Sequence, residues 1–189
     1  AEQKGTGHAV KQAIDLADDH ALVIIAYGDV PLIRSETLQR LAAGLGLSTL
    51  CVLTTFLDQP KGYGRVVRDA GHGGVKAIVE EKDATDAIRQ IKEVNTGFMA
   101  ARASDWKRWL SQLSPQNAQG EYYLTDCVGL AVTEGWVVNT VVCEDAQEVE
   151  GVNNRVQLAR LERVAQLRQV ESLMLAGVNV ADPARLDIR

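Results

Sequence analysis

An apolar hexapeptide that ends in an acidic turn constrains the fold of this chain most strongly. Residues 21–26 read ALVIIA, and the segment Tyr27-Gly28-Asp29-Val30-Pro31 follows at once. A short apolar run bounded by turn residues is typical of a strand that is buried on both faces of a parallel sheet. Pro31 ends the strand because proline has no N–H to donate. The pattern predicts that Asp29 lies at the carboxyl end of a central strand, where open α/β sheets bind ligands.

An aspartate at that position has two interpretations. Its carboxylate is a good ligand for Mg²⁺, which takes few protein carboxylates and completes its shell with water and phosphate oxygens. An aspartate after a strand can equally cap the next turn. The local pattern around Asp29 leaves both interpretations open.

The remainder of the chain alternates between apolar strands and amphipathic helices. We predict further strands at 47–56, 62–68, 75–80, 93–101 and 136–143, and helices at 5–20, 36–43, 83–90, 124–134 and 154–176, with another helix starting at Ser104. Ser35 and Ser104 are the expected N-caps, and Gly177 is the expected stop of the last helix. This alternation predicts an α/β fold with a mostly parallel sheet and a β-rich insertion.

Composition restricts the partners of the protein. A net charge of −5 argues against nucleic acid as a partner. No apolar run approaches the ~20 residues that span a bilayer, and no signal-peptide pattern opens the chain, so we expect a cytoplasmic protein without a membrane partner. Cys51, Cys127 and Cys143 form neither a CxxC nor a zinc pattern, and Cys51 and Cys143 are predicted to be small core residues.

Six short motifs follow one another in a specific order. They are GTGHA at 5–9, YGDVPL at 27–32, GYGR at 62–65, VNTG at 94–97, QGEYYLTD at 119–126 and EVEGVNNR at 148–155. Each motif alone is weak evidence. Together, over nearly the whole chain, they closely resemble the uridyltransferase domain of the bacterial bifunctional N-acetylglucosamine-1-phosphate uridyltransferase/glucosamine-1-phosphate acetyltransferase family.

The resemblance implies a Rossmann-like nucleotidyltransferase sheet and a Mg²⁺-dependent reaction in the cytoplasm. UTP and N-acetylglucosamine 1-phosphate would give UDP-N-acetylglucosamine and pyrophosphate. In the complete enzyme this step would be coupled to acetylation of glucosamine 1-phosphate and would serve the synthesis of peptidoglycan and lipopolysaccharide precursors.

The resemblance also divides the chain. Residues 1–153 would be the C-terminal part of the uridyltransferase domain, 154–176 a linker helix, and 177–189 the start of a left-handed β-helix acetyltransferase domain. That β-helix domain would make the complete enzyme a homotrimer.

Site residues follow from the matched motifs. Asp29, the catalytic metal ligand, and Asn153 would hold Mg²⁺, although Asn153 or Asn154 could instead cap the helix that follows. Gly5, Thr6, Tyr27 and Gly28 would contact the nucleotide.

The sugar pocket would use Gly64, Glu80 and Asn95, because a carboxylate accepts from sugar hydroxyls and an amide both donates and accepts. Tyr123 and Thr125 are candidates for closing its acetamido side. Glu81 and Lys82 are interpreted as a solvated charge pair.

One family feature is absent from the sequence. Neither GxGxxG nor GxxxxGK[ST] occurs, and the family's glycine-rich loop for the triphosphate is missing. We therefore expect residues 1–189 alone to be inactive. Two alternative functions remain, namely a non-catalytic module that binds sugar nucleotides, and a transferase for another sugar 1-phosphate. The segments QGEYYLTD and EVEGVNNR favour N-acetylglucosamine.

Overall fold

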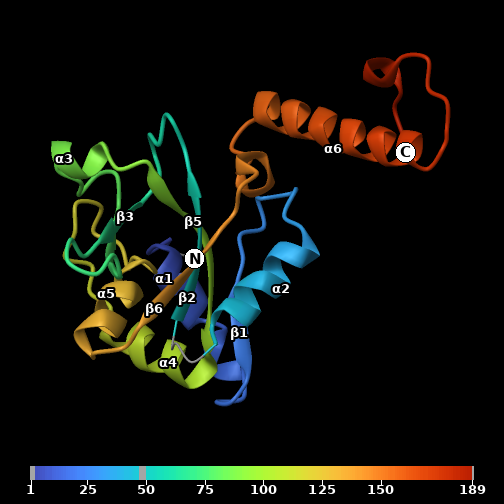
Figure 1. Cartoon of the computed structure of the whole chain (residues 1–189). Helices are drawn as coiled ribbons and strands as arrows, with labels where there is room; N and C mark the ends of the chain where they lie inside the picture. The colour runs from blue at the N-terminus through green and yellow to red at the C-terminus, as the bar shows by residue number, and fades with distance from the viewer. Residues whose placement is uncertain (1–2, 47–49, 189) are drawn as a thin grey trace. The chain divides into compact units, whose positions relative to one another are not determined.

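The computed structural model describes residues 3–46 and 50–188, which form two compact units. Unit 1 contains the described residues up to Tyr27 and those from Arg34 to Ala146. Unit 2 contains Gly28–Ile33 and the described residues from Gln147 onward. Figure 1 shows the course of the chain through both units.

A six-stranded mixed sheet is the framework of unit 1. Its strands are β1 (Leu22–Ile25), β2 (Leu50–Phe56), β3 (Arg65–Arg68), β4 (Val75–Val79), β5 (Glu93–Arg102) and β6 (Val138–Val142). The order is β4-β3-β5-β2-β6, and β1 also pairs with β5. The long strand β5 therefore connects β1, β2 and β3.

The predicted α/β class is confirmed, but the pairing is less parallel than expected. Among the described strands, β2 and β6 pair in parallel and the other four pairings are antiparallel. Since β1 and β2 both run antiparallel to β5, strands β1, β2 and β6 share one direction. The antiparallel β5, inserted between β1 and β2, was not recognisable as such from its sequence.

Strand β1 is not the buried central strand that its apolar sequence predicts. Leu22 is 45% exposed, and Val23, Ile24 and Ile25 are half-buried. Within the described residues β1 pairs along one edge only, with β5. The indole Nε1 of Trp106 donates to the Val23 carbonyl at 3.3 Å and so links β1 to the helix that contains Trp106.

Most helices begin and end close to the predicted positions. The helices are α1 (Thr6–Lys11), α2 (Ser35–Gly44), α3 (Asp86–Arg89), α4 (Ala103–Gln112), α5 (Asp126–Thr133) and α6 (Arg155–Leu175), with short 3₁₀ turns at Ile14–Leu16, Ala146–Val149 and Pro183–Arg185. The helix predicted over 5–20 breaks into α1 and the first 3₁₀ turn. Ser35 and Ser104 are not N-caps but lie inside the first turns of α2 and α4. The first three residues of the strand predicted over 47–56 lie outside the described residues.

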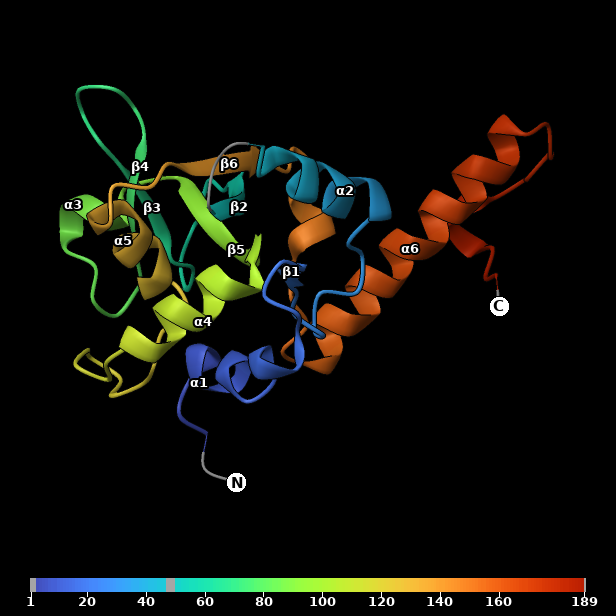
Figure 2. The ribbon, with the colours of Figure 1, turned by 90° about the horizontal axis from the view of Figure 1, so that it is seen from below.

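Helices cover both faces of the sheet in unit 1. Alternate residues of β5 point to opposite sides, as the pleat requires. Met99 and Ala101 face the core that contains Trp106 and Trp109 of α4. On the other face α2 contacts β2, β5 and β6. Figure 2 shows β1 and the end of β5 between α2 on one side and α1 and α4 on the other. The three cysteines are buried and form no disulfide bond within the described residues, and this burial was predicted for Cys51 and Cys143.

Unit 2 is built around α6. The Asn154 side chain accepts hydrogen bonds from the amides of Val156 and Gln157 at 3.1 and 3.0 Å, so the predicted cap is confirmed for Asn154. Gly177 has φ +97° and ends the helix in a Schellman motif, in which the amide of Val178 bonds back to the Leu173 carbonyl. Along the described chain no helix has the length and apolar character needed to cross a membrane.

Gly97 is the most constrained glycine of the sheet. It has φ +91° inside β5, and a Cβ atom there would lie 2.1 Å from Cε2 of the Tyr27 ring. Gly97→Ala should lower the free energy of unfolding by more than about 1 kcal/mol, because alanine is strained at positive φ and would also displace the ring. Chemical denaturation of the purified chain measures this change.

Gly129→Ala is the matched control. Gly129 lies inside α5 with no atom within 4 Å of the Cβ position. The substitution should stabilise by roughly 0.5–1 kcal/mol, because alanine restricts the unfolded chain. Equal effects of the two substitutions would contradict the packing described for Gly97.

Candidate functional site

Three of the sequence-predicted sugar-site residues meet in unit 1. Gly64 immediately precedes β3, Glu80 follows β4, and Asn95 lies in β5. The amide of Asn95 donates to the Gly64 carbonyl at 2.9 Å. A Cβ atom at Gly64 would stand 3.3 Å from Oε2 of Glu80, so glycine leaves room for that carboxylate. Residues from three separate segments thus form one polar cluster.

Thr125 closes this cluster from a fourth segment. Its hydroxyl donates to Oε1 of Glu80 at 2.8 Å, and Thr125 is only 5% exposed. This contact joins the QGEYYLTD segment to the end of β4. The role of Thr125 at the border of the sugar pocket stays a prediction.

Asn95 has one half of its amide engaged. Its Oδ1 accepts from the Gly97 amide at 3.0 Å, and the residue is 8% exposed. Within the described residues Nδ2 has no acceptor, and it is not among the fully enclosed unpaired atoms. A donor held by a buried strand and open to solvent can bind a hydroxyl or a phosphate oxygen.

The environment of Glu80 opposes its charge. Burial raises the pKa of the Glu80 carboxyl, the Thr125 hydroxyl partly offsets this, and the nearby carboxylates of Asp126 and Asp83 raise it further. Burial likewise raises the pKa of Asp126, with a smaller contribution from Asp83. A ligand that donates hydrogen bonds to Glu80 would relieve the lost solvation.

The predicted nucleotide contacts Gly5 and Thr6 border the QGEYYLTD segment. Gly5 has φ +97°, and a Cβ atom there would lie 2.8 Å from the Tyr122 carbonyl. The Thr6 hydroxyl accepts from the Leu124 amide at 3.3 Å, while the Gly7 amide donates to the Tyr122 carbonyl at 2.9 Å. Both predicted residues therefore contact the QGEYYLTD segment.

Tyr27 belongs to the same unit and lies over β5. Its ring packs edge-on against Phe98 at a centroid distance of 6.4 Å and covers Gly97. Gly97 is two residues from Asn95, so Tyr27 borders the strand that carries Asn95. This proximity was not evident from the sequence.

The proposed metal ligands Asp29 and Asn153 lie in unit 2, with Gly28 preceding Asp29. The amide of Val152 donates to the Asp29 carbonyl at 2.8 Å, which joins two segments far apart in sequence. A Cβ atom at Gly151 would lie 3.5 Å from Oδ2 of Asp29. Both Asp29 and Asn153 are exposed.

These residues fit a Mg²⁺ site. A carboxylate and an amide oxygen are hard ligands, and their exposure leaves room for water and phosphate. The described part of the chain contains no group of three or more His, Cys, Asp or Glu that could hold a metal. A magnesium ion that keeps most of its water requires no such group.

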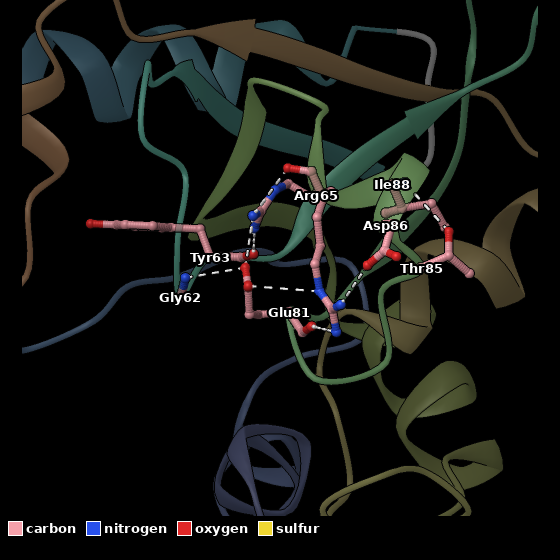
Figure 3. Close-up of polar contacts among 8 residues, drawn as sticks. Gly62, Tyr63, Arg65, Glu81, Thr85, Asp86 and Ile88 are labelled. Carbon is pink, nitrogen blue, oxygen red and sulfur yellow. Dashed lines mark hydrogen bonds and ion pairs between the residues drawn. The ribbon is translucent and has the colours of Figure 1, made fainter.

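The interpretation of Glu81 and Lys82 as a solvated pair is wrong. Glu81 faces the buried guanidinium of Arg65, with Oε2 to Nη2 at 2.7 Å, and also accepts from the Gly62 amide at 3.2 Å (Figure 3). Arg65 is only 2% exposed and also donates to the carbonyls of Tyr63 and Arg89. Lys82 instead contacts Gln119 at 2.5 Å. Glu81 pairs with Arg65 because the guanidinium of Arg65 is buried. The adjacency of Glu81 and Lys82 in the sequence does not indicate this pairing.

Comparison with known proteins identifies the fold. No protein-family model matches the chain. A solved UDP-glucose pyrophosphorylase with bound UDP-glucose is similar at a TM-score of 0.59 and 15% identity, over 74% of this chain and 55% of that one. A Bacillus anthracis protein described as a glucose-1-phosphate thymidylyltransferase, in complex with sucrose, has a TM-score of 0.58 and 14% identity, over 97% of this chain and 66% of that one.

The chain therefore shares the fold of these two solved structures. The chain spans 55% and 66% of the lengths of these two neighbours. At 15% and 14% identity the likeness establishes the fold alone.

The raised pKa of Glu80 predicts how pH affects stability. The pKa of the Glu80 carboxyl is higher in the folded protein than in the unfolded chain, where it is roughly 4. Ionisation of Glu80 therefore destabilises the fold as the pH rises from the unfolded pKa through the folded pKa. Glu80→Gln cannot ionise and can still accept from Thr125. The Tm of this variant relative to the parent chain should therefore increase between pH 4 and pH 7, as measured by thermal unfolding monitored with circular dichroism.

Glu81→Gln is the control with the opposite sign. The hydrogen bond from Arg65 lowers the pKa of Glu81, so its stabilisation is present above the unfolded pKa and lost at lower pH. The Tm of this variant relative to the parent chain should fall between pH 4 and pH 7. A Glu80→Gln difference that is flat or falls over this range would contradict the environment described for Glu80.

Proposed function

We propose that this chain is part of a nucleotidyltransferase that converts UTP and N-acetylglucosamine 1-phosphate into UDP-N-acetylglucosamine and pyrophosphate. The observation that carries the proposal is the polar cluster of Gly64, Glu80, Asn95 and Thr125. It combines a carboxylate with unsatisfied acceptor capacity and an amide donor without a partner in the described chain. A sugar presents both donors and acceptors, and such a cluster complements it.

The chemistry needs little covalent participation by the protein. An oxygen of the sugar 1-phosphate attacks the α-phosphorus of UTP, a new P–O bond forms, and the bond between the α-phosphorus and the bridging oxygen breaks to release pyrophosphate. Catalysis then consists mainly of positioning and charge neutralisation. In this proposal Glu80 accepts from a sugar hydroxyl and the Asn95 amide donates to the sugar, which orients the phosphate.

Nucleotide contacts are assigned to Gly5, Thr6, Tyr27 and Gly28. The positive φ of Gly5 and its tight approach to the Tyr122 carbonyl fix the backbone at the start of α1. The UDP-glucose carried by one structural neighbour and the thymidylyltransferase description of the other support a nucleoside and a sugar as the substrate class.

Asp29, as the catalytic residue, and Asn153 would hold Mg²⁺ on unit 2. When bound, the ion would neutralise charge on the phosphates. The Val152–Asp29 backbone hydrogen bond keeps the two ligand-bearing segments together. Asn154 serves as the helix cap, so Asn153 is released from that task.

The proposal extends to the complete protein. Residues 1–153 would belong to the transferase domain, 154–176 would link it to a second domain, and 177–189 would begin a β-helix with acetyltransferase activity. The complete enzyme would be a cytoplasmic homotrimer that supplies cell-wall precursors. These features rest on the ordered motifs of the sequence.

Ligand binding to residues 1–189 tests the substrate assignment. Isothermal titration calorimetry should give a smaller Kd for UDP-N-acetylglucosamine than for UDP-glucose and dTDP-glucose. Turnover is then measured on the complete protein as pyrophosphate released from UTP, with N-acetylglucosamine 1-phosphate and glucose 1-phosphate compared. Binding without turnover would favour a non-catalytic module, and preference for glucose 1-phosphate would contradict the assignment to N-acetylglucosamine.

Asp29→Asn tests the metal site separately. Mn²⁺, a paramagnetic substitute for Mg²⁺, should broaden the backbone amide NMR signals of residues 28–30 and 151–153 in the parent chain. The variant should lose most of this broadening, because the amide that replaces the carboxylate carries no charge. Asp58→Asn, which changes a carboxylate that is 95% exposed in unit 1, is the control and should leave the broadening intact. Equal broadening in the Asp29→Asn variant would contradict the assignment.

A further inference from the structure

Two segments beside the sugar-site cluster are joined by four side-chain contacts. One is the turn of residues 80–83 after β4, and the other is the loop of residues 117–125 before α5. The contacts are Glu80 with the Thr125 hydroxyl at 2.8 Å, Lys82 with Gln119 at 2.5 Å, and Asp83 with both the Ala118 amide at 2.9 Å and the Tyr123 hydroxyl at 3.1 Å. No other function has been assigned above to Asp83.

Both carboxylate oxygens of Asp83 are engaged with this loop. Oδ1 accepts from the Ala118 backbone, and Oδ2 accepts from the Tyr123 phenol. Tyr123 is 7% exposed, so its hydroxyl is a largely buried donor that needs an acceptor. Asp83 therefore binds the loop at Ala118 and at Tyr123, near its two ends.

The loop is folded upon itself between these two points. Asn117 accepts from the amides of Gln119 and Glu121 at 3.2 Å each and donates to the Glu121 carbonyl at 2.5 Å. A loop that is compact internally moves as one piece, so its attachment points determine where it lies. Among the described contacts of this turn, Asp83 supplies two attachments and Lys82 and Glu80 one each.

Thr125 follows Tyr123 by two residues, so the anchored phenol limits where the Thr125 hydroxyl can lie. That hydroxyl is the group that orients Glu80. We propose that Asp83 is a positioning residue for the sugar 1-phosphate site, because it fixes the loop that carries Tyr123 and Thr125 and so sets the Glu80 carboxylate. The proposal rests on the proposed function for its ligand, while the attachment of the loop can be tested without any ligand.

A positioning role differs from a general contribution to stability in what it changes. Loss of Asp83 should weaken binding of the sugar 1-phosphate more than binding of UTP, because the Thr125 hydroxyl bonds directly to Glu80, whereas Gly5 and Thr6 meet the loop at the Tyr122 carbonyl and the Leu124 amide. General destabilisation would weaken both to the same degree. Loss of an acceptor from two hydrogen bonds should raise the Kd for N-acetylglucosamine 1-phosphate on the order of tenfold.

The first experiment measures hydrogen exchange of residues 1–189 without ligand. Asp83→Ala should accelerate exchange of the Ala118 amide and of its neighbours through Tyr123, because the amide loses its acceptor. Asp86→Ala removes a carboxylate that is 99% exposed three residues further on, and is the matched control. Unchanged exchange at Ala118 in Asp83→Ala would overturn the proposal whatever the protein binds.

The second experiment is a double-mutant cycle read by calorimetry with N-acetylglucosamine 1-phosphate. Asp83→Ala and Tyr123→Phe should each raise the Kd, and the double variant should be weaker than the parent by less than the product of the two effects, because both remove the same contact. A parent chain that binds no sugar phosphate or sugar nucleotide would overturn the proposed function. A parent chain that binds, together with an Asp83→Ala Kd equal to that of Asp86→Ala, would overturn only the role of Asp83.

Discussion

The buried strand β5 is the constraint on which the candidate site depends. Its residues from Glu93 to Ala101 are all buried, and it pairs with β1, β2 and β3. A shift of its register by one residue would turn every side chain to the opposite face. The packing of Met99 and Ala101 against the tryptophans of α4 holds one end of β5, and the pairing of Asn95 with Thr54 and with the Gly64 carbonyl holds the other. In this way the apolar core and the strand pairing of unit 1 together position a polar site.

The site retains polar groups that do not favour folding. Glu80 ionises in an environment that opposes its charge, close to Asp83 and Asp126. In the described part of the chain two enclosed side-chain atoms lack hydrogen bonds, Oγ1 of Thr54 and Nε of Arg65. Thr54 lies opposite Asn95 in the β2–β5 pairing, and Arg65 follows Gly64 directly. An unsatisfied buried polar atom costs about 1–3 kcal/mol, so their concentration around this cluster is the pattern expected where function opposes stability.

Local sequence patterns predicted the elements better than their pairing. Apolar patterns predicted all six strands, because buried positions are occupied by apolar residue types. It could not reveal that β5 runs antiparallel to β1 and β2, since strand direction depends on distant partners. The apolar sequence of β1 suggested a central strand, yet its one described pairing leaves Leu22 exposed. Ser35 and Ser104 lie within the helices that they were expected to cap.

The candidate site shows the same difference. The sequence indicated some of its residues, and contacts made only in the fold determine the role of others. The resemblance in sequence indicated Gly64, Glu80 and Asn95, which the fold brings together. The sequence indicated no role for Asp83 or Arg65. Asp83 contacts the loop of residues 117–125 and Arg65 contacts Glu81, and no sequence pattern predicts either contact. Lys82 and Glu81 are adjacent in sequence but bind different segments.

A crystal structure of residues 1–189 grown with saturating UDP-N-acetylglucosamine tests the central claim most directly. The account predicts electron density for the sugar with one hydroxyl within hydrogen-bonding distance of the Glu80 carboxylate and an acceptor oxygen within reach of Nδ2 of Asn95. A sugar bound elsewhere on the chain, or a cluster of Gly64, Glu80 and Asn95 that stays free of ligand, would contradict it.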